Sequence, residues 1–219
     1  MNDKDSVYLA HFLFSDCAMN ENVMEQLRTA TAAERMCRLR YVEGEHMQDV
    51  CLQVHKDQIL LISNQKIGSI SLERIEPAAV EQTCLQLFNI VEPLEPGYPL
   101  VPALMMSRHK YEELKESSGS STLHSLVQSL FAETGEYEHS AQLAKVMKYY
   151  CTEGELRLCS RSDSGWKVHY AAYIGDFSSG WLLRMNCNAA EDWLIAFPMN
   201  KSQLCNTFTE WVLQPSTIL

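Results

Sequence analysis

The strongest constraint on the fold of this chain is a pattern that occurs twice. Residues 38–91 and residues 155–212 each contain a short strand, a hairpin, a further strand and then a proline, Pro77 or Pro198. Proline is favoured in the first turn of a helix because its φ is already helical and its missing N–H had no partner there. Each copy is therefore predicted to be a β-β-β-β-α unit whose helix begins at the proline.

The spacing after the two prolines is the same in both copies. Gln82 corresponds to Gln203 and Cys84 corresponds to Cys205, each displaced by 121 positions (203 − 82 and 205 − 84). Two copies of so long a period do not fit a solenoid, which stacks several shorter repeats. We predict an α+β fold in which pseudo-twofold duplicated β-β-β-β-α halves form a mostly antiparallel sheet covered by helices.

The local patterns outside the two copies favour helices and one edge segment. Apolar residues at helical spacing predict helices at 7–14, where a strand is the alternative, and at 23–30. Further helices are predicted at 107–115, capped by Ser107, and at 123–130 and 140–151. Residues 98–106 contain too many prolines for a central strand and are expected at a sheet edge.

One stretch near the middle of the chain has the composition of a linker. Residues 117–122 consist almost entirely of serine with one glycine. They would separate an N-terminal half, residues 1–116, from a C-terminal half, residues 123–219. We predict that both halves form one structural domain, and two separate domains split at this stretch are the alternative.

The bulk composition argues against several classes of function. An apolar share of 46% and a charged share of 21% in 219 residues are typical of a globular protein. A formal charge of −10 without a basic cluster argues against nucleic-acid binding. We find no signal peptide, no apolar run near the roughly 20 residues that span a bilayer, and no CxxC pair among the eight cysteines. We expect a cytoplasmic protein with reduced thiols and no membrane insertion.

The chain carries no recognisable catalytic or cofactor motif. GxGxxG, the phosphate-binding loop, HExxH and GxSxG are all absent, so we expect no catalytic, cofactor-binding or metal-ligating residue. The nearest feature is residues 43–49, a predicted loop with three acids and one histidine, which we interpret as a solvated turn between strands. An enzyme whose site assembles only in three dimensions is the least favoured reading.

All four tryptophans fall in the second copy. Trp181, Trp193 and Trp211 follow apolar patterns and are predicted to be large core residues of that half. Trp166 follows a turn-forming Asp-Ser-Gly and is predicted to be the most exposed of the four. Tryptophan is enriched in protein interfaces, so Trp166 is a candidate contact residue.

The order of elements resembles the EspG family of type VII secretion chaperones across residues 22–212. The residues that carry the resemblance are Ile-Glu-Pro-Ala-Ala-Val at 75–80 with the Pro/Gly-rich exit at 93–97, and Gly-Trp-Leu-Leu-Arg at 180–184 with Asp-Trp-Leu-Ile-Ala-Phe-Pro at 192–198. This chain is shorter than mycobacterial members, richer in Cys and Met, and poorer in Ala and Arg.

The resemblance implies a non-enzymatic bacterial chaperone without a cofactor. Such a protein binds the exposed apolar tip of a helical secreted protein and keeps it soluble. In the family the substrate meets a loop between strands and helices of the second half, which correspond here to residues 43–49 and 140–150. The candidate partner-binding residues are Glu43, Glu45, His46, Met47 and Trp166. An immunity protein or another protein-interaction module is the alternative function.

Overall fold

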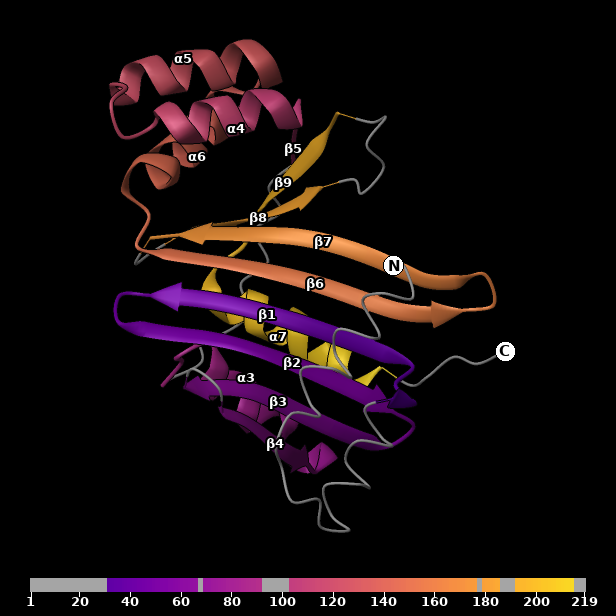
Figure 1. Ribbon diagram of the computed structural model, residues 1–219. Coiled ribbons are helices and arrows are strands. Elements are labelled where there is room, and N and C mark those ends of the chain that lie inside the picture. Colours follow the sequence, from indigo (N-terminus) through magenta and orange to yellow (C-terminus); the bar gives the residue numbers. More distant parts are fainter. Residues whose placement is uncertain (1–30, 67–68, 92–102, 177–178, 186–191, 215–219) are drawn as a thin grey trace.

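The computed structural model describes residues 31–66, 69–91, 103–176, 179–185 and 192–214 (Figure 1). The helices predicted at 7–14 and 23–30 lie outside these residues.

The described residues form one sheet of nine antiparallel strands in the order β4-β3-β2-β1-β6-β7-β8-β9-β5 (Figure 1). The first four strands are β1 (Arg35–Glu43), β2 (His46–His55), β3 (Gln58–Lys66) and β4 (Ser69–Ile75). The other five are β5 (Leu104–Met106), β6 (Thr152–Ser162), β7 (Gly165–Gly175), β8 (Gly180–Met185) and β9 (Leu194–Pro198). The α+β class and the antiparallel sheet are confirmed, and β5 is the expected edge strand. The internal duplication stays a prediction.

Strands β1 and β6 form the centre of the sheet and join its two sides. Their register runs from Arg35 opposite Ser160 to Glu43 opposite Thr152. Successive side chains of a strand point to opposite faces. Leu39 in β1 and Leu156 in β6, which pair directly, are both buried and belong to the same core cluster.

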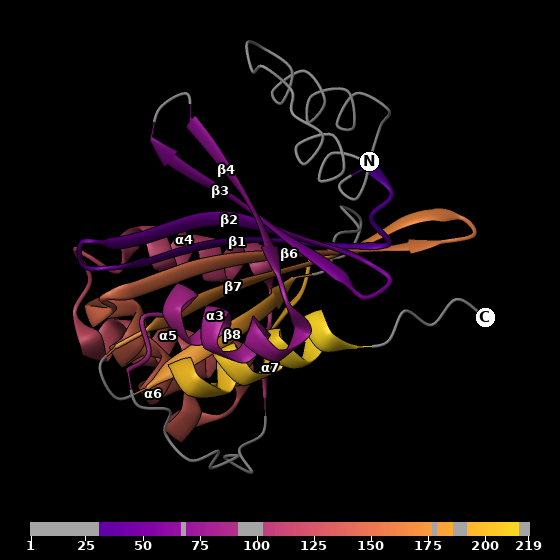
Figure 2. The same cartoon turned by 90° about the horizontal axis from the view of Figure 1, so that it is seen from below.

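Two helices cover one face of the sheet, α3 (Val80–Leu87), which follows the 3-10 turn η1 (Pro77–Ala79), and α7 (Lys201–Leu213). They lie side by side (Figure 2). Cys84 of α3 and Cys205 of α7, the matched cysteines of the two copies, are both buried in this core. The rings of Phe88 and Phe208 meet edge to face with centroids 5.6 Å apart.

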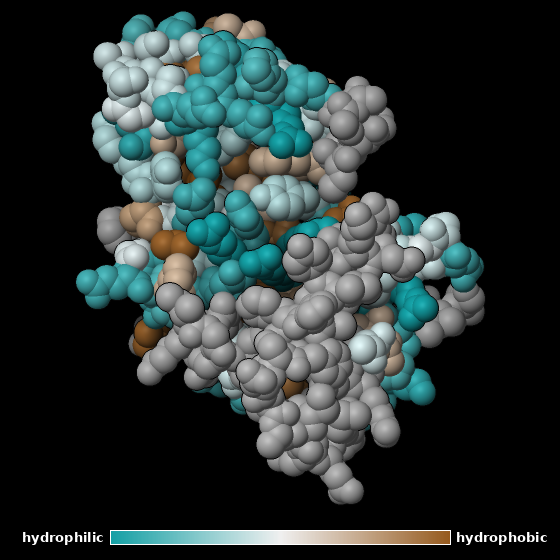
Figure 3. Space-filling model, viewed as in Figure 1, coloured by the Kyte–Doolittle hydropathy of each residue, from teal (hydrophilic) through white to brown (hydrophobic). Residues whose placement is uncertain are grey.

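Three further helices cover the other face over β7, β8, β9 and β5. They are α4 (Arg108–Ser117), α5 (Leu123–Thr134) and α6 (Tyr137–Tyr149). Strand β8 shows the two faces directly, because Leu182 packs towards α7 whereas Trp181 and Leu183 pack towards α4, α5 and α6. The outward surface over α4 is hydrophilic (Figure 3). In this part of the molecule the sheet therefore lies between two layers of helices, with α7 on one face and α4, α5 and α6 on the other.

The two prolines predicted to open helices behave differently. Pro77 begins the 3-10 turn that leads into α3, as predicted. Pro198 instead ends β9, where it pairs with Trp181, so its predicted role is wrong. Helix α7 begins at Lys201, because Asn200 and Gln203 form a capping box in which each side chain accepts a hydrogen bond from the backbone N–H of the other.

Helix α3 ends before the first copy does at residue 91. Helix α3 stops at Leu87, and Asn89 adopts a left-handed conformation with φ of 52° that turns the chain away. Val91, the last residue of the first copy, is 91% exposed.

The stretch predicted to be linker-like is a short turn between helices. Helix α4 continues to residue 117, and the Thr122 side chain caps α5. Between them, Lys148 Nζ donates to the backbone oxygens of Ser118 at 3.1 Å and Ser121 at 2.7 Å. These hydrogen bonds fix the turn against α6. The division of the chain into halves at this point stays a prediction.

Candidate functional site

The segment at residues 43–49, predicted to be a loop, is almost entirely strand. β1 ends at Glu43, β2 begins at His46, and these two residues pair across a two-residue turn. Gly44 takes the first position of that turn with φ of 58°, a conformation that glycine adopts without strain. The loop prediction is wrong because Gly-Glu alone reverses the chain, which leaves the following polar residues to alternate along β2.

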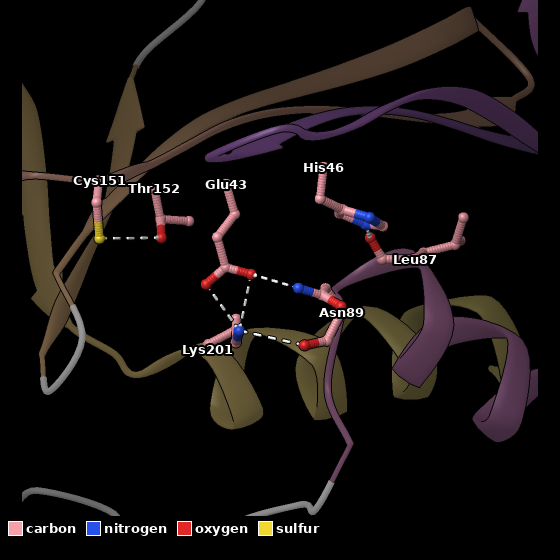
Figure 4. A network of polar contacts seen from close by, with 7 residues as sticks. All are labelled: Glu43, His46, Leu87, Asn89, Cys151, Thr152 and Lys201. Carbon is pink, nitrogen blue, oxygen red and sulfur yellow. Dashed lines mark hydrogen bonds and ion pairs between the residues drawn. The ribbon is translucent and has the colours of Figure 1, made fainter.

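Glu43 points from this turn towards the two helices below the sheet (Figure 4). Lys201 Nζ donates to Glu43 Oε1 at 2.8 Å and to Oε2 at 2.9 Å, and it also reaches the backbone oxygen of Asn89 at 3.3 Å. Asn89 Nδ2 donates to Glu43 Oε2 at 3.1 Å. We call Glu43, Asn89 and Lys201 the Glu43 clamp. It ties the β1–β2 turn to the end of α3 and the start of α7.

The electrostatics of the Glu43 clamp suit a carboxylate. A helix N-terminus carries a partial positive charge, and Lys201 adds a full charge in the first turn of α7. The carboxylate of Glu43 offsets both. The two side chains are 23% and 31% exposed, so water screens their attraction only in part. These contacts indicate a structural role for Glu43.

His46 is held on the same side of the sheet. Its Nε2 donates to the backbone oxygen of Leu87 at 3.3 Å, and its ring meets that of Tyr41 edge to face at 6.4 Å. Burial raises the pKa of the Tyr41 hydroxyl well above its usual value, and the nearby charge of Glu43 adds to the shift. Glu45 and Met47 are exposed instead.

Trp166 lies at the opposite end of the sheet from the other four candidates. β6 runs antiparallel to β1, and Trp166 pairs with Arg161, one residue beyond the position opposite Arg35. Eight residues of β1 separate Glu43 from Arg35, which corresponds to about 27 Å at 3.4 Å per residue. The structure therefore brings Glu43, Glu45, His46 and Met47 together and leaves Trp166 apart.

The tryptophans are not arranged as predicted. Trp181 is buried, but Trp193 is the exposed one at 36%, and Trp166 and Trp211 are half-buried. Trp193 stands just before β9, outside the pairing with β8, so its ring is not enclosed between layers.

Four thiols in the described part of the chain, those of Cys37, Cys51, Cys84 and Cys205, are poor nucleophiles because burial raises their pKa. None of the six cysteines there forms a disulfide bond within the described residues. Burial raises the pKa of Cys205 to about 12 and that of Cys37 well above its usual value, so both stay protonated at neutral pH. Within the same residues, no three His, Cys, Asp or Glu side chains cluster closely enough to hold a metal ion.

Two residues of the Glu43 clamp were not anticipated from the sequence. The Asn-Lys-Ser-Gln at 200–203 has the spacing of a capping box, which would have placed Lys201 in the first turn of a helix. No signal marks Asn89, because its position depends on where α3 ends.

Comparison with known proteins finds a likeness of structure but none of sequence family. No protein-family model matches this sequence, and no curated protein matches it. Among solved structures, the chain is similar to EspG5, a type VII secretion system chaperone of Mycobacterium tuberculosis, whose structure was determined in complex with the PE25-PPE41 dimer. The match has a TM-score of 0.60 at 12% sequence identity and covers 97% of this chain and 84% of EspG5. None of the described helices is long and apolar enough to cross a membrane. The chain thus shares the fold of a type VII secretion chaperone.

Proposed function

We propose that this chain is a cytoplasmic, non-enzymatic protein-binding module that holds a helical secreted protein in a soluble, export-competent state. The observation that carries the proposal is the likeness of fold to EspG5, which covers 97% of this chain and 84% of EspG5. Because the match extends over 97% of this chain, it is not confined to one local motif. A partner with an apolar helical tip would be protected from aggregation when that tip is covered.

The β1–β2 turn is the surface that we propose for the partner. Met47 is 66% exposed there, beside the exposed Glu45. The Glu43 clamp and His46 hold the turn against α3 and α7, so these two side chains project from a fixed backbone. A flexible thioether can adapt to an apolar surface, and binding to a rigid turn loses little conformational entropy. Trp166 lies too far away to belong to the same contact.

The test is capture of the partner from the native host. The tagged protein is purified from cells that express the secretion system, and co-eluting proteins are identified by mass spectrometry and their stoichiometry by light scattering. We expect one helical secreted protein in a fixed ratio. Met47→Asp should reduce its recovery. Met105→Asp is the matched control, because Met105 is also an exposed methionine on a strand, 67% exposed on β5.

The possible results separate the proposal from its alternatives. Recovery of a toxin domain would support the immunity reading and contradict the chaperone reading. Absence of any stoichiometric partner would contradict both. Equal recovery with the Met47 and Met105 variants would retain the function but exclude the β1–β2 turn as the contact.

A further inference from the structure

A groove lies between α7 and strands β6 to β9, on the face of the sheet that α3 and α7 cover. Its volume is about 690 Å³. Figure 2 shows α7 running along the sheet towards the end where the β6–β7 hairpin projects. Among the described residues, β8 pairs with β7 from Tyr170 to Gly175.

The floor of the groove is an apolar extension of the main core. Six apolar residues line it, and five of them are only partly buried. They are Leu158, Ala171, Leu182, Phe197, Met199 and Trp211. Apolar side chains that pack on a core yet keep exposed surface gain free energy when a ligand covers them. A purely ionic ligand would leave this area open to water.

The charges around the groove have the opposite sign to the protein as a whole. Arg35, Arg161 and Arg184 line it, against one carboxylate among the described lining residues, that of Glu34, although the chain has a formal charge of −10. Glu34 Oε1 lies 3.5 Å from Nδ1 of His55, at the end of the groove beside β2. The groove therefore attracts anionic groups on a molecule that otherwise repels them.

Arg35 is the residue that points to a specific ligand group. Its side chain is more than nine-tenths buried, and its guanidinium lies 5.8 Å from the centre of the Trp211 ring. One Nη donates to the backbone oxygen of Trp211 at 2.6 Å. The Nε–H is buried and has no hydrogen-bond partner among the described residues. A buried charged donor without a partner is costly, and a carboxylate fits the fork geometry of a guanidinium.

We propose that this groove binds a segment of a partner protein in which an acidic side chain is flanked by apolar side chains. The carboxylate would pair with Arg35 at the inner end, Arg184 would add a positive charge at the exposed rim, and the apolar neighbours would cover the floor. The identity of the occupant as a protein rests on the proposed function. The groove follows α7 from Thr207 to Gln214, about 10 Å at 1.5 Å per residue, which corresponds to about three residues of extended chain.

The test uses peptides, so it does not depend on capturing the natural partner. A library of capped pentapeptides carries a central Asp flanked on each side by Leu, Ile, Val, Phe or Met, and a second library carries Asn at the centre. Binding to the full chain is measured by fluorescence polarisation. We expect the best Asp peptide to bind about tenfold more tightly than its Asn counterpart, because the latter lacks the charge-assisted hydrogen bonds.

Two variants with matched charge changes locate the binding. Arg184→Glu reverses an exposed charge at the groove and should weaken the Asp peptide by about fivefold or more. Arg157→Glu reverses an exposed charge on β6, on the opposite face of the sheet, and should change binding by less than about twofold. Arg35→Lys keeps the charge and removes the fork. Arg35→Lys should also weaken binding of the Asp peptide. If this variant does not fold, the comparison of Arg184→Glu with Arg157→Glu still tests whether the peptide binds in the groove.

Three results would overturn the proposal. The first is equal binding of the Asp and Asn peptides, and the second is equal effects of the Arg184 and Arg157 variants. The third is that the protein binds no peptide but binds decanoate in a way that depends on Arg184, which would make the groove a lipid site. Peptide binding in a protein that captures no secreted partner would contradict the proposed function and leave the groove assignment standing. Capture of a secreted partner that is insensitive to Arg184→Glu would support the proposed function and contradict the assignment of the groove.

Discussion

Breaking the Glu43 clamp is expected to destabilise the fold, because Glu43 joins three segments that are distant in sequence. Glu43→Gln keeps the size of the side chain and one acceptor oxygen, but it places an amide N–H₂ where Lys201 and Asn89 both donate. Lys201→Met removes the charge from the other side and keeps the apolar stem. Each variant removes the ion pair while leaving the packing of β1 and α7 in place.

The magnitude follows from the burial of the pair. Fully exposed ion pairs contribute about 0.2–1 kcal/mol, whereas hydrogen bonds to charged groups that are shielded from water contribute about 1.5–3 kcal/mol. Glu43 and Lys201 are 23% and 31% exposed, between these limits. We expect each single variant to lower the free energy of unfolding by about 2 kcal/mol, with a coupling energy of about 1 kcal/mol in the double variant. A loss of 2 kcal/mol lowers Tm by about 4–8 °C for a chain of this length.

The assay is urea unfolding followed by tryptophan fluorescence and by circular dichroism, with coincidence of the two curves as the test of two-state behaviour. Glu113→Gln is the control. It breaks the exposed pair of Lys110 and Glu113, which are 3.0 Å apart on one helix, and should cost less than about 0.5 kcal/mol. A coupling energy between Glu43 and Lys201 no larger than about 0.3 kcal/mol would show that the two effects are independent and that the clamp does not stabilise the fold.

Two further predictions concern a close approach and a buried thiol. Gly180→Ala should lower the free energy of unfolding in urea by about 3 kcal/mol, because the new Cβ would lie 2.6 Å from the Met199 backbone oxygen and would overlap the Tyr173 ring. The control is Gly119→Ala, whose Cβ would meet nothing within 4 Å and should change stability by less than about 0.5 kcal/mol. Equal effects of the two variants would refute this prediction. Burial raises the pKa of Cys205 from 9.0 to about 12, so the folded state holds the thiol proton more tightly than the unfolded state and loses stability as pH rises from about 9 towards 12. In this range the free energy of unfolding of the wild type should fall by about 1 kcal/mol per pH unit relative to that of Cys205→Ala. Parallel pH profiles of the two proteins would contradict this prediction.

The strands were predictable because their pattern is local. Alternation of buried and exposed residues along β1 and β2, and the continuous apolar run of β3, are visible in the sequence without any knowledge of neighbours. The error at Pro198 has a specific cause. Proline is allowed at the end of a strand as well as in the first helical turn, and the capping box of Asn200 and Gln203 decides between these positions.

The candidate site was predictable only in part because its geometry is not local. The polar residues from Glu43 to Asp49 stood out, but alternation along a strand sends Glu43 inward and Met47 outward, which depends on where the turn falls. Arg35 gave no signal at all. Its burial depends on Trp211, 176 residues later in the chain, and a contact of that kind leaves no periodic trace.

Helix α7 links the two proposed surfaces and sets how they should behave together. Its first residue, Lys201, holds the β1–β2 turn, and Trp211 near its end lines the groove. Ten residues of helix separate them by about 15 Å. Effects of substitutions more than about 10 Å apart usually add, so Met47→Asp and Arg184→Glu should weaken a partner that contacts both surfaces independently, by a product of their separate factors. A combined loss smaller than that product would indicate that the partner uses the two surfaces as alternatives.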